Sequence, residues 1–363
     1  MKTIVTFGEV MGRLCPDDFE RFSQSMPGNM NLTFAGAEAN VAASIAMLGG
    51  KARFVTTLPK NEISNACIAT LRGLKIDVSG INLADYGRLG LYFVERGANQ
   101  RPSRVIYDRD HSSVSLAPAD SYNWNHLFKD TGWLHTTGIT PALSETAAEA
   151  AETAVKEAKT AGLTVSCDLN FRKKLWRWKP DVVPSELAGK TMRQILPFVD
   201  VVIANEEDAH DVLGISAENT DVEAGHLDVS KYTEVAKEIV NQFPNVKIVT
   251  ITLRESISAS HNNWGAMMYD ADNENTYFAP IQNGKYMPYE IRSIVDRVGG
   301  GDAFGAALIF ALNTPELASP EDALRFATAS SCLSHSINGD FNYVSRSEVE
   351  SLMGGSASGR VIR

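Results

Sequence analysis

The chain of 363 residues is predicted to form an α/β fold, in which a mainly parallel central sheet is flanked by helices. Strand-like and helix-like segments alternate along most of its length, and this favours parallel strands joined by helical crossovers. Polar residues directly follow several of the predicted strands, where open sheets of this class bind ligands. Two strand-like runs within residues 89–109 interrupt the alternation, which predicts a small second sheet.

The predicted strands are short apolar runs, and several predicted helices end at glycine or proline. In the first part of the chain, strands are predicted at Lys2–Phe7 and Arg53–Thr57, and helices at Phe34–Leu48 and about Ile63–Leu71. Later strands are predicted at Trp133–Gly138, Leu163–Leu169, Val199–Ala204 and Val246–Thr252, with antiparallel edge strands at Trp264–Tyr269 and Asn275–Phe278. Later helices are predicted at Ser144–Ala161, Lys231–Phe243, Ala303–Leu312 and Glu321–Ser334.

Two segments of the first part depart from this regular pattern. Glu9–Leu32 contains Pro16 and Pro27 and is predicted to be irregular. Leu89–Arg96 and Arg104–Arg109 are strand-like and are joined by a polar connection, which predicts an antiparallel hairpin. Because a hairpin alone is only marginally stable, we expect it to pack on the body or on a second subunit.

Charge and composition narrow the class of partner. The net charge of −10 argues against a general affinity for nucleic acid or anionic membranes. The sequence contains no run of about 18 uncharged apolar residues, and its first residues show no secretory pattern. The four cysteines are far apart, without metal-ligand or disulfide spacing. These features predict a cytoplasmic protein with reduced thiols.

Three consecutive glycines and an aspartate precede the uncharged run Ala303–Leu312, which is predicted to be a buried helix. The first N–H groups of a helix lack internal partners and carry partial positive charge, so Gly299, Gly300 and Gly301 could form an anion-binding corner. Asp302 beside it could accept a proton from an attacking hydroxyl. A tight loop with an acidic N-cap is the alternative interpretation of the same residues.

The segment Asp296–Phe304 resembles the D-x-x-G-x-G-D signature of the ribokinase-like (PfkB) carbohydrate kinases. The resemblance extends from Gly8 to about Asp340 and implies a ribokinase-like fold with a β-sheet lid, using ATP and Mg²⁺. It also implies that the glycines form an anion hole and that Asp302 is the catalytic base. We expect a kinase domain at 1–345, with the lid inserted from about 11–33 and 89–111, and a C-terminal segment and tail at 346–363. In this family the lid closes over the sugar and often joins subunits, so a homo-oligomer through the lid is expected.

The sugar side of the site resembles one branch of this family. Gly36 and Asn40 match the Gly-Gly-x-x-x-Asn motif, with Ala35 in place of the first glycine; the alternative is a helix start with a buried asparagine. The stretch Asn170–Trp176 resembles the branch that phosphorylates 2-keto-3-deoxygluconate. In that branch the arginine at position 172 contacts the acid sugar, and further ligand contacts match Tyr92, Tyr107, Arg109 and Asp340.

Physical chemistry agrees with this assignment, although each residue also has a simpler explanation. Arg172 and Arg109 would compensate the charge of an acidic sugar, because a guanidinium can bind a carboxylate through two hydrogen bonds. The basic and aromatic run after Arg172 could instead be a solvated helix face with packed tryptophans. Asp340 could be an ordinary aspartate of a surface turn.

The nucleotide side matches the family less closely. Asn205 and Asp208 resemble the Asn-x-x-Glu motif that organises Mg²⁺ through water, with aspartate in the last position; a capped acidic helix start is the alternative. Thr252, Arg254 and Ser256 lie where relatives carry a Thr-Leu-Gly-x-x-Gly turn that contacts ATP. Arg254 and Ser256 stand near the expected glycines, and Ser258–Asn263 is predicted to be a longer polar loop.

The sequence therefore predicts an ATP-dependent kinase that phosphorylates the primary hydroxyl of 2-keto-3-deoxy-D-gluconate. A kinase for a neutral ketose or another sugar acid, or a non-catalytic sugar or nucleotide sensor of the same fold, is the alternative. The sequence lacks Gly-x-x-x-x-Gly-Lys-(Ser/Thr) and so does not support a P-loop kinase. It also lacks Gly-x-Gly-x-x-Gly after the first strand, which argues against a dinucleotide-dependent dehydrogenase. The seven histidines show no metal-ligand spacing.

Overall fold

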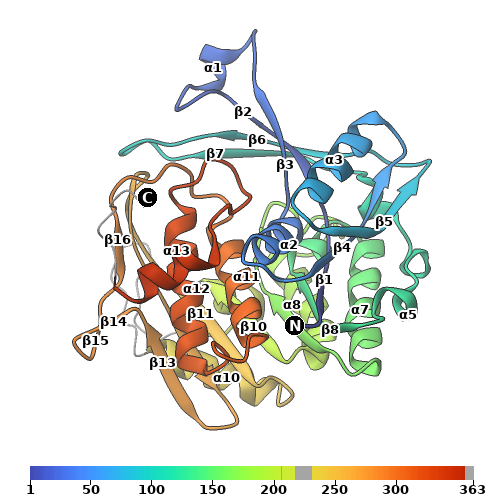
Figure 1. Ribbon diagram of the computed structural model, residues 1–363. Helices are drawn as coiled ribbons and strands as arrows, with labels where there is room; N and C mark the ends of the chain where they lie inside the picture. The colour runs from blue at the N-terminus through green and yellow to red at the C-terminus, as the bar shows by residue number, and fades with distance from the viewer. Residues whose placement is uncertain (206, 217–230, 356–363) are drawn as a thin grey trace.

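The computed structural model describes residues 1–205, 207–216 and 231–355. Within these residues, a ten-stranded sheet lies between two layers of helices, in the order β13-β12-β11-β10-β9-β8-β1-β4-β5, with β16 also paired to β12 (Figure 1). Its strands are β1 (Thr3–Phe7), β4 (Ala52–Pro59), β5 (Asp77–Ala84), β8 (Thr131–Thr137), β9 (Thr164–Asp168), β10 (Val201–Asn205), β11 (Ile248–Ser258), β12 (His261–Asp270), β13 (Asn275–Ala279) and β16 (Tyr289–Ile291). The predicted α/β class is confirmed.

The strand order reverses beside β1. The chain leaves β1 for β4 and β5 on one side, and later builds β8, β9, β10 and β11 on the other. All of these strands are parallel, whereas β12 and β13 at one edge are antiparallel, as predicted. In open sheets of this kind a ligand crevice forms at the carboxyl ends of the strands, next to the reversal.

Each face of the sheet is covered by its own helices and its own apolar core. One core contains residues of α2 (Ala37–Met47), α3 (Glu62–Gly73), α11 (Gly300–Leu312), α12 (Pro320–Ser334) and α13 (Arg346–Met353). The other contains residues of α7 (Glu145–Thr160), α8 (Pro184–Ile195) and α10 (Lys231–Gln242). Every residue of α11 from Ala303 to Ala311 is buried, as its lack of charged residues predicts.

A separate four-stranded sheet, which we call the lid, crosses the top of the molecule in the order β3-β2-β6-β7 (Figure 1). Its elements are β2 (Met11–Cys15), α1 (Phe22–Ser25), β3 (Asn31–Ala35), β6 (Gly90–Glu95) and β7 (Arg104–Asp108). The predicted antiparallel hairpin is confirmed. The prediction that Glu9–Leu32 is irregular was wrong, because β2 lies within it and β3 begins in it at Asn31. Phe34 and Ala35 belong to β3, and the following helix begins at Ala37.

The register of the lid separates its two faces. Arg13, Tyr92 and Tyr107 stand opposite one another across β2, β6 and β7 and therefore share a face. The adjacent row on the other face is apolar and consists of Leu32, Leu14, Phe93 and Ile106. The first row faces the cavity described below, since Tyr92 and Tyr107 line it.

Shorter elements complete the chain: α4 (Ser113–Leu116), η1 (Ala119–Ser121), α5 (Trp124–Leu127), α6 (Ile139–Ala142), η2 (Leu196–Phe198), α9 (Asp208–Leu213), β14 (Ile281–Gln282) and β15 (Lys285–Tyr286). Two further boundaries, both in segments that contribute to the candidate site, differ from the predicted ones. Helix α11 already starts at Gly300, and the expected long loop at Ser258–Asn263 is a tight hairpin turn between β11 and β12. Most of the predicted tail, 356–363, lies outside the described residues. No helix of the described residues is both long and apolar enough to cross a membrane.

The close approach of β8 and β9 at their carboxyl ends depends on Gly138. A Cβ atom at this position would overlap the Leu169 carbonyl oxygen, whereas one at Gly73, at the end of α3, would meet nothing within 4 Å. We expect Gly138→Ala to lower the free energy of unfolding by about 1–3 kcal/mol through overpacking. We expect Gly73→Ala to change it by less than about 1 kcal/mol. Chemical denaturation of both variants measures the difference, and equal effects would contradict this explanation.

Candidate active site

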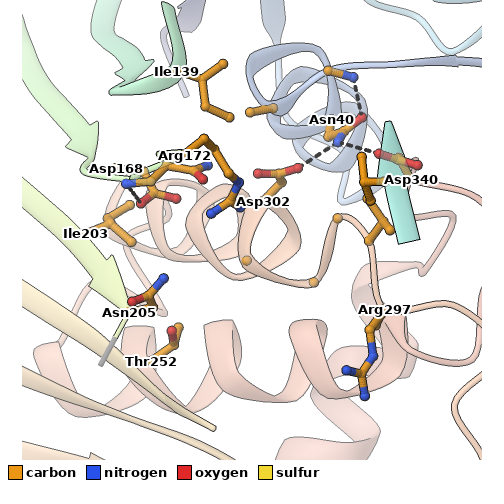
Figure 2. A pocket seen from close by; sticks show the side chains of 18 of the residues that line it. Asn40, Ile139, Asp168, Arg172, Ile203, Asn205, Thr252, Arg297, Asp302 and Asp340 are labelled. Atoms are coloured by element: carbon orange, nitrogen blue, oxygen red, sulfur yellow. Dashed lines mark hydrogen bonds between the residues drawn. The ribbon is translucent and has the colours of Figure 1, made fainter. Parts of the chain in front are cut away.

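A cavity of about 310 Å³ opens at the carboxyl ends of the sheet strands, beneath the lid (Figure 2). It brings together nearly all of the predicted site residues: Gly36, Asn40, Tyr92, Tyr107, Arg109, Arg172, Asn205, Asp208, Thr252, Arg254, Gly299, Gly300, Gly301, Asp302 and Asp340. Ser256 does not line the cavity and is exposed on β11. Segments more than 250 residues apart in the chain thus meet at one site, as expected for a crevice beside the strand reversal.

The glycines form the start of α11. Gly299 caps the helix with a left-handed backbone (φ 87°), and a Cβ atom there would lie 2.5 Å from the Asp340 carbonyl oxygen. Gly300 and Gly301 belong to the first helical turn, so their N–H groups are among those without an intrahelical partner. A Cβ atom on Gly301 would meet nothing within 4 Å, so a ligand can approach this backbone closely.

Asp302 lies in the same first turn and points toward Asn40 of α2 (Figure 2). The Asn40 Nδ2 donates to Asp302 Oδ2 at 2.6 Å, and Asn40 Oδ1 accepts from the Gly36 N–H at 3.2 Å. Burial raises the pKa of Asp302 to about 7, although the Asn40 hydrogen bond acts in the opposite direction. A carboxylate with such a pKa can exchange protons near neutrality, as a general base requires.

Asp340 is held from three sides. Arg13 of the lid bridges Asp340 and Asp296, and the Tyr92 hydroxyl donates to Asp340 Oδ2 at 2.7 Å. Asn40 Nδ2 lies 3.5 Å from the same oxygen. The predicted substrate contacts Tyr92 and Asp340 therefore bind each other in this structure. Sequence reasoning missed Arg13, and no local motif around it indicates the two aspartates that it binds.

Arg109 is also engaged. It forms a buried ion pair with Glu9, in which Arg109 Nε donates to Glu9 Oε2 at 2.7 Å, and its guanidinium lies 5.6 Å from the centre of the Tyr107 ring. The Glu9 carboxylate thus already compensates the charge of Arg109. Contact of Arg109 with a ligand stays a prediction, and the pairing with Glu9 could not be read from a local motif because the two residues are 100 positions apart.

Arg172 remains exposed at the cavity, beside Asp302 and Asp168 (Figure 2). Its Nη1 donates to the Phe171 carbonyl oxygen at 3.1 Å. Burial and the nearby carboxylates of Asp208 and Asp302 raise the pKa of Asp168 well above its usual value, and Arg172 partly offsets this. Asp168 is the last residue of β9 and so belongs to a strand end of the kind at which ligand residues are predicted.

Asn205 and Asp208 bind each other at the end of β10. Asp208 Oδ2 accepts from the Asn205 N–H at 3.0 Å, and its Oδ1 accepts from the Phe171 N–H at 3.0 Å. Asn205 Oδ1 in turn accepts from the Asp208 N–H at 2.9 Å. Asp208 is thus buried with both oxygens engaged, and no group of three acidic, histidine or cysteine side chains within the described ranges could hold a metal. Magnesium at this site would depend on water and ligand oxygens.

Beyond the glycines, the cavity wall is formed by residues of β11, β12, the loop before α11 and the end of α12. The members that sequence reasoning missed are Asn262, Trp264, Arg297 and His335. His335 Nδ1 lies 2.7 Å from the Ser331 carbonyl oxygen, and burial lowers the pKa of His335, so the ring is neutral near pH 7 with its proton on Nδ1.

The family model described as pfkB family carbohydrate kinase matches residues 1–340. The chain belongs to this family. Since the match includes the segments that bring the glycines, Asp302 and Arg172 to one cavity, this pfkB protein is a sugar phosphotransferase.

Relatives of this pfkB kinase include proteins that act on acidic sugars by name. The structure of a 2-dehydro-3-deoxygluconokinase from Thermotoga maritima is 41% identical, with a TM-score of 0.87, and covers 98% of this chain and 100% of that chain. A 2-dehydro-3-deoxygalactonokinase from Haloferax volcanii is 31% identical over 356 residues, 98% of each chain. A putative ribokinase II from E. coli, solved with ATP and Mg²⁺, shares the fold at 20% identity (TM-score 0.75; 98% of this chain and 100% of that chain).

The raised pKa of Asp302 predicts the pH dependence of this pfkB kinase. The family resemblance predicts that Asp302 is the catalytic base, which acts as the ionised carboxylate. We therefore expect kcat/KM to fall about tenfold per pH unit below about pH 7 and to level off above it. Asn40→Ala removes a hydrogen bond that stabilises the carboxylate, and the acidic limb should then move to higher pH. A pH profile of each protein measures the shift.

Other charges also face Asp302 and are left unchanged by that variant: Glu38, Asp340 and Arg172. The matched control is Asn65→Ala. Asn65 is exposed on α3, and its side-chain amide donates to Glu62 rather than to Asp302. Its pH profile should coincide with that of the wild type. An Asn40→Ala limb at unchanged or lower pH would contradict the assignment of Asp302 as the titrating group.

Proposed function

We propose that this kinase transfers the γ-phosphoryl group of ATP to the primary hydroxyl of 2-keto-3-deoxy-D-gluconate. The proposal rests on one observation: Asp302, with its pKa near neutrality, lies between the glycine corner of α11 and the exposed guanidinium of Arg172. A base, a phosphate site and a cation for an acidic substrate then occupy one cavity.

In the proposed reaction, the Asp302 carboxylate accepts the proton of the substrate hydroxyl. The hydroxyl oxygen forms a bond to the γ-phosphorus, and the bond from that phosphorus to the bridging oxygen of ADP breaks. The N–H groups of Gly300 and Gly301 stabilise negative charge on the phosphoryl oxygens, and Asn40 orients the base. ATP bound with Mg²⁺ supplies the phosphoryl group, and the metal neutralises phosphate charge.

The residues of the cavity fit the nucleotide and its metal. Gly301 leaves open space in front of the backbone, which suits a phosphate group. Asn205 would contact Mg²⁺ through water, whereas Asp208 would act by holding Asn205, because both of its oxygens are engaged. Thr252 and Arg254 are proposed to contact the nucleotide from β11, and Ser256 is not, because it lies outside the cavity.

The acidic substrate is proposed from Arg172 and from the relatives. Arg109 is neutralised by Glu9, so Arg172 supplies the charge that a substrate carboxylate would meet. The Thermotoga maritima relative is named for the gluconate-derived sugar acid and the Haloferax volcanii relative for the galactonate-derived one. The second is therefore the rival substrate. A neutral ketose would leave Arg172 without a carboxylate, and a non-catalytic sensor has no need for Asp302.

The deciding experiment measures ATP consumption with both keto-deoxy acids, other sugar acids and neutral ketoses. We expect turnover with a 2-keto-3-deoxy acid, and Asp302→Asn should lower kcat by roughly 10²–10⁴-fold, since a general base contributes that much. We expect the Asp302→Asn variant to fold. The stability that the protonated Asp302 carboxyl contributes is lost as pH rises through about 7, so a neutral asparagine avoids this loss at pH 8. Unchanged turnover would refute the role of Asp302.

The role of Arg172 has its own test. Arg172→Ala should lower kcat/KM for the keto-deoxy acid roughly 10–100-fold, because a charge-assisted interaction is lost, and activity on neutral sugars should stay absent. Lys173→Ala is the matched control, since Lys173 is equally exposed on the same segment but does not line the cavity. Equal losses in the two variants would point to general attraction of anions by the basic segment rather than to a contact by Arg172.

We also propose that two copies of this chain associate through the outer face of the lid, and that the protein acts in the cytoplasm. The apolar row Leu32, Leu14, Phe93 and Ile106 lies on that face, with Leu32 48% and Ile106 55% exposed. Burying this row against a second copy removes apolar surface from water.

Ile106→Asp should shift the protein from dimer to monomer, because a carboxylate would be buried without a partner at the centre of the interface. Sedimentation or light scattering measures the mass. Val183→Asp is the control, since Val183 is 61% exposed at the start of α8, away from the lid. A wild-type monomer, or a dimer that Ile106→Asp leaves intact, would contradict the proposed interface.

A further inference from the structure

The cavity wall beyond the glycine corner carries buried hydrogen-bond donors that nothing in the described protein satisfies. They are Asn262 Nδ2, Trp264 Nε1 and Arg297 Nε. Asn262 is 1% exposed and Trp264 is 5% exposed, and all three residues line the cavity. Buried donors without a partner destabilise a protein, so three of them beside one cavity indicate a missing acceptor.

The strand register explains why these donors gather on one wall. Asn262 and Trp264 are two residues apart on β12 and therefore share a face of the sheet. Arg254 stands opposite Trp264 on β11, and its side chain belongs to the same face. Thr252, two residues earlier on β11, continues this face toward the end of β10. The wall is thus a continuous sheet surface that faces the start of α11.

Arg297 binds the turn between β11 and β12 and the side chain of Asn262. Its Nη2 donates to the Ser258 and Ala259 carbonyl oxygens at 3.1 Å and to Asn262 Oδ1 at 3.2 Å. Because Oδ1 is the acceptor in this contact, the amide nitrogen of Asn262 is the group left over. These contacts hold the Arg297 guanidinium in place and leave Asn262 Nδ2 available to donate to a ligand.

The charge of the wall is positive. Burial lowers the pKa of Arg297, and the neighbouring charge of Arg254 lowers it further. Asp296, which acts in the opposite direction, is bound by Arg13. Two guanidinium groups near each other favour an anion between or beside them.

His335 connects this wall to the glycine corner. A Cβ atom on Gly300 would lie 3.0 Å from the His335 ring, and the rings of His335 and Trp264 lie 5.0 Å apart between centres. A ligand with one phosphate at the first turn of α11 would therefore extend along His335 toward Trp264 and Arg297. Arg297 lies across the glycine turn from Arg172 and the sugar side of the cavity (Figure 2).

We propose that Asn262, Trp264 and Arg297 form a subsite for the oxyanions of the nucleotide's polyphosphate chain. The inference rests on the proposed function only for the presence of a nucleotide. In this subsite, hydrogen bonds from the buried amide, indole and guanidinium groups hold the phosphates behind the one that is transferred, and Arg254 adds positive charge. The wall thus takes the place of the glycine turn that the sequence lacks.

Calorimetric titration of the full chain with ADP and Mg²⁺, and separately with inorganic tripolyphosphate, tests the subsite. Asn262→Asp keeps the acceptor for Arg297 but removes the donor and adds negative charge, and it should weaken both ligands at least about tenfold. Trp264→Phe removes the indole N–H but keeps a ring against His335, and it should weaken both ligands about threefold to tenfold. Because it adds no charge, Trp264→Phe also serves if Asn262→Asp does not fold.

The control is Asn263→Asp, the same substitution on the opposite face of β12, where the side chain contacts Glu255. Its affinities should equal those of the wild type. Unchanged affinity for ADP in both test variants would overturn the proposal. It would mean that water, or a free anion detected only with tripolyphosphate, satisfies these donors. If no sugar is phosphorylated but ADP binding still depends on Asn262, the proposed function fails and the subsite stands.

Discussion

One buried arginine determines how the lid and the catalytic end of the sheet fit together. Arg13 of β2, 2% exposed, binds both Asp296 before the glycine corner and Asp340 after α12. Removing one member of a buried ion pair typically costs about 3–5 kcal/mol, because the remaining charge has no partner. Gly299 packs directly on the Asp340 carbonyl oxygen, so the position of this loop also sets the position of the glycine corner. The position of the glycine corner thus depends on a residue of the lid.

The same arrangement connects the lid to the proposed base. Asn40 donates to Asp302 and lies within 3.5 Å of Asp340. A movement of Asp340 would therefore change the position of the Asn40 side-chain amide and its hydrogen bond to Asp302. Burial makes ionisation of Asp302 less favourable, as does the neighbouring Asp340 carboxylate, and the resulting pKa near neutrality suits proton transfer. The burial of Asp302 thus raises its pKa into the range that the proposed proton transfer requires.

The regular elements could be predicted from the sequence because their signals are local. The uncharged run after Asp302 indicated a buried helix, and Ser144 caps α7 as expected. The strands β2 and β3 were missed because Pro16 and Pro27 interrupt their segment and because β2 finds its parallel partner, β6, about 80 residues later. The site residues were found through motifs, but their partners were not: Arg13 and Glu9 become visible only when the lid is folded onto the body.

These unpredicted partners change which residue can select an acidic substrate. Glu9 neutralises Arg109, and Arg13 and Tyr92 occupy Asp340, so neither predicted contact offers an uncompensated charge. Burial and neighbouring carboxylates favour the neutral form of Asp168, and a neutral acid does not offset the charge of Arg172. A ligand carboxylate would supply that compensation, whereas a neutral sugar would have to displace the water around Arg172 without replacing it by a charge. The proposed selectivity for an acid then rests on the raised pKa of Asp168 together with the arginine itself.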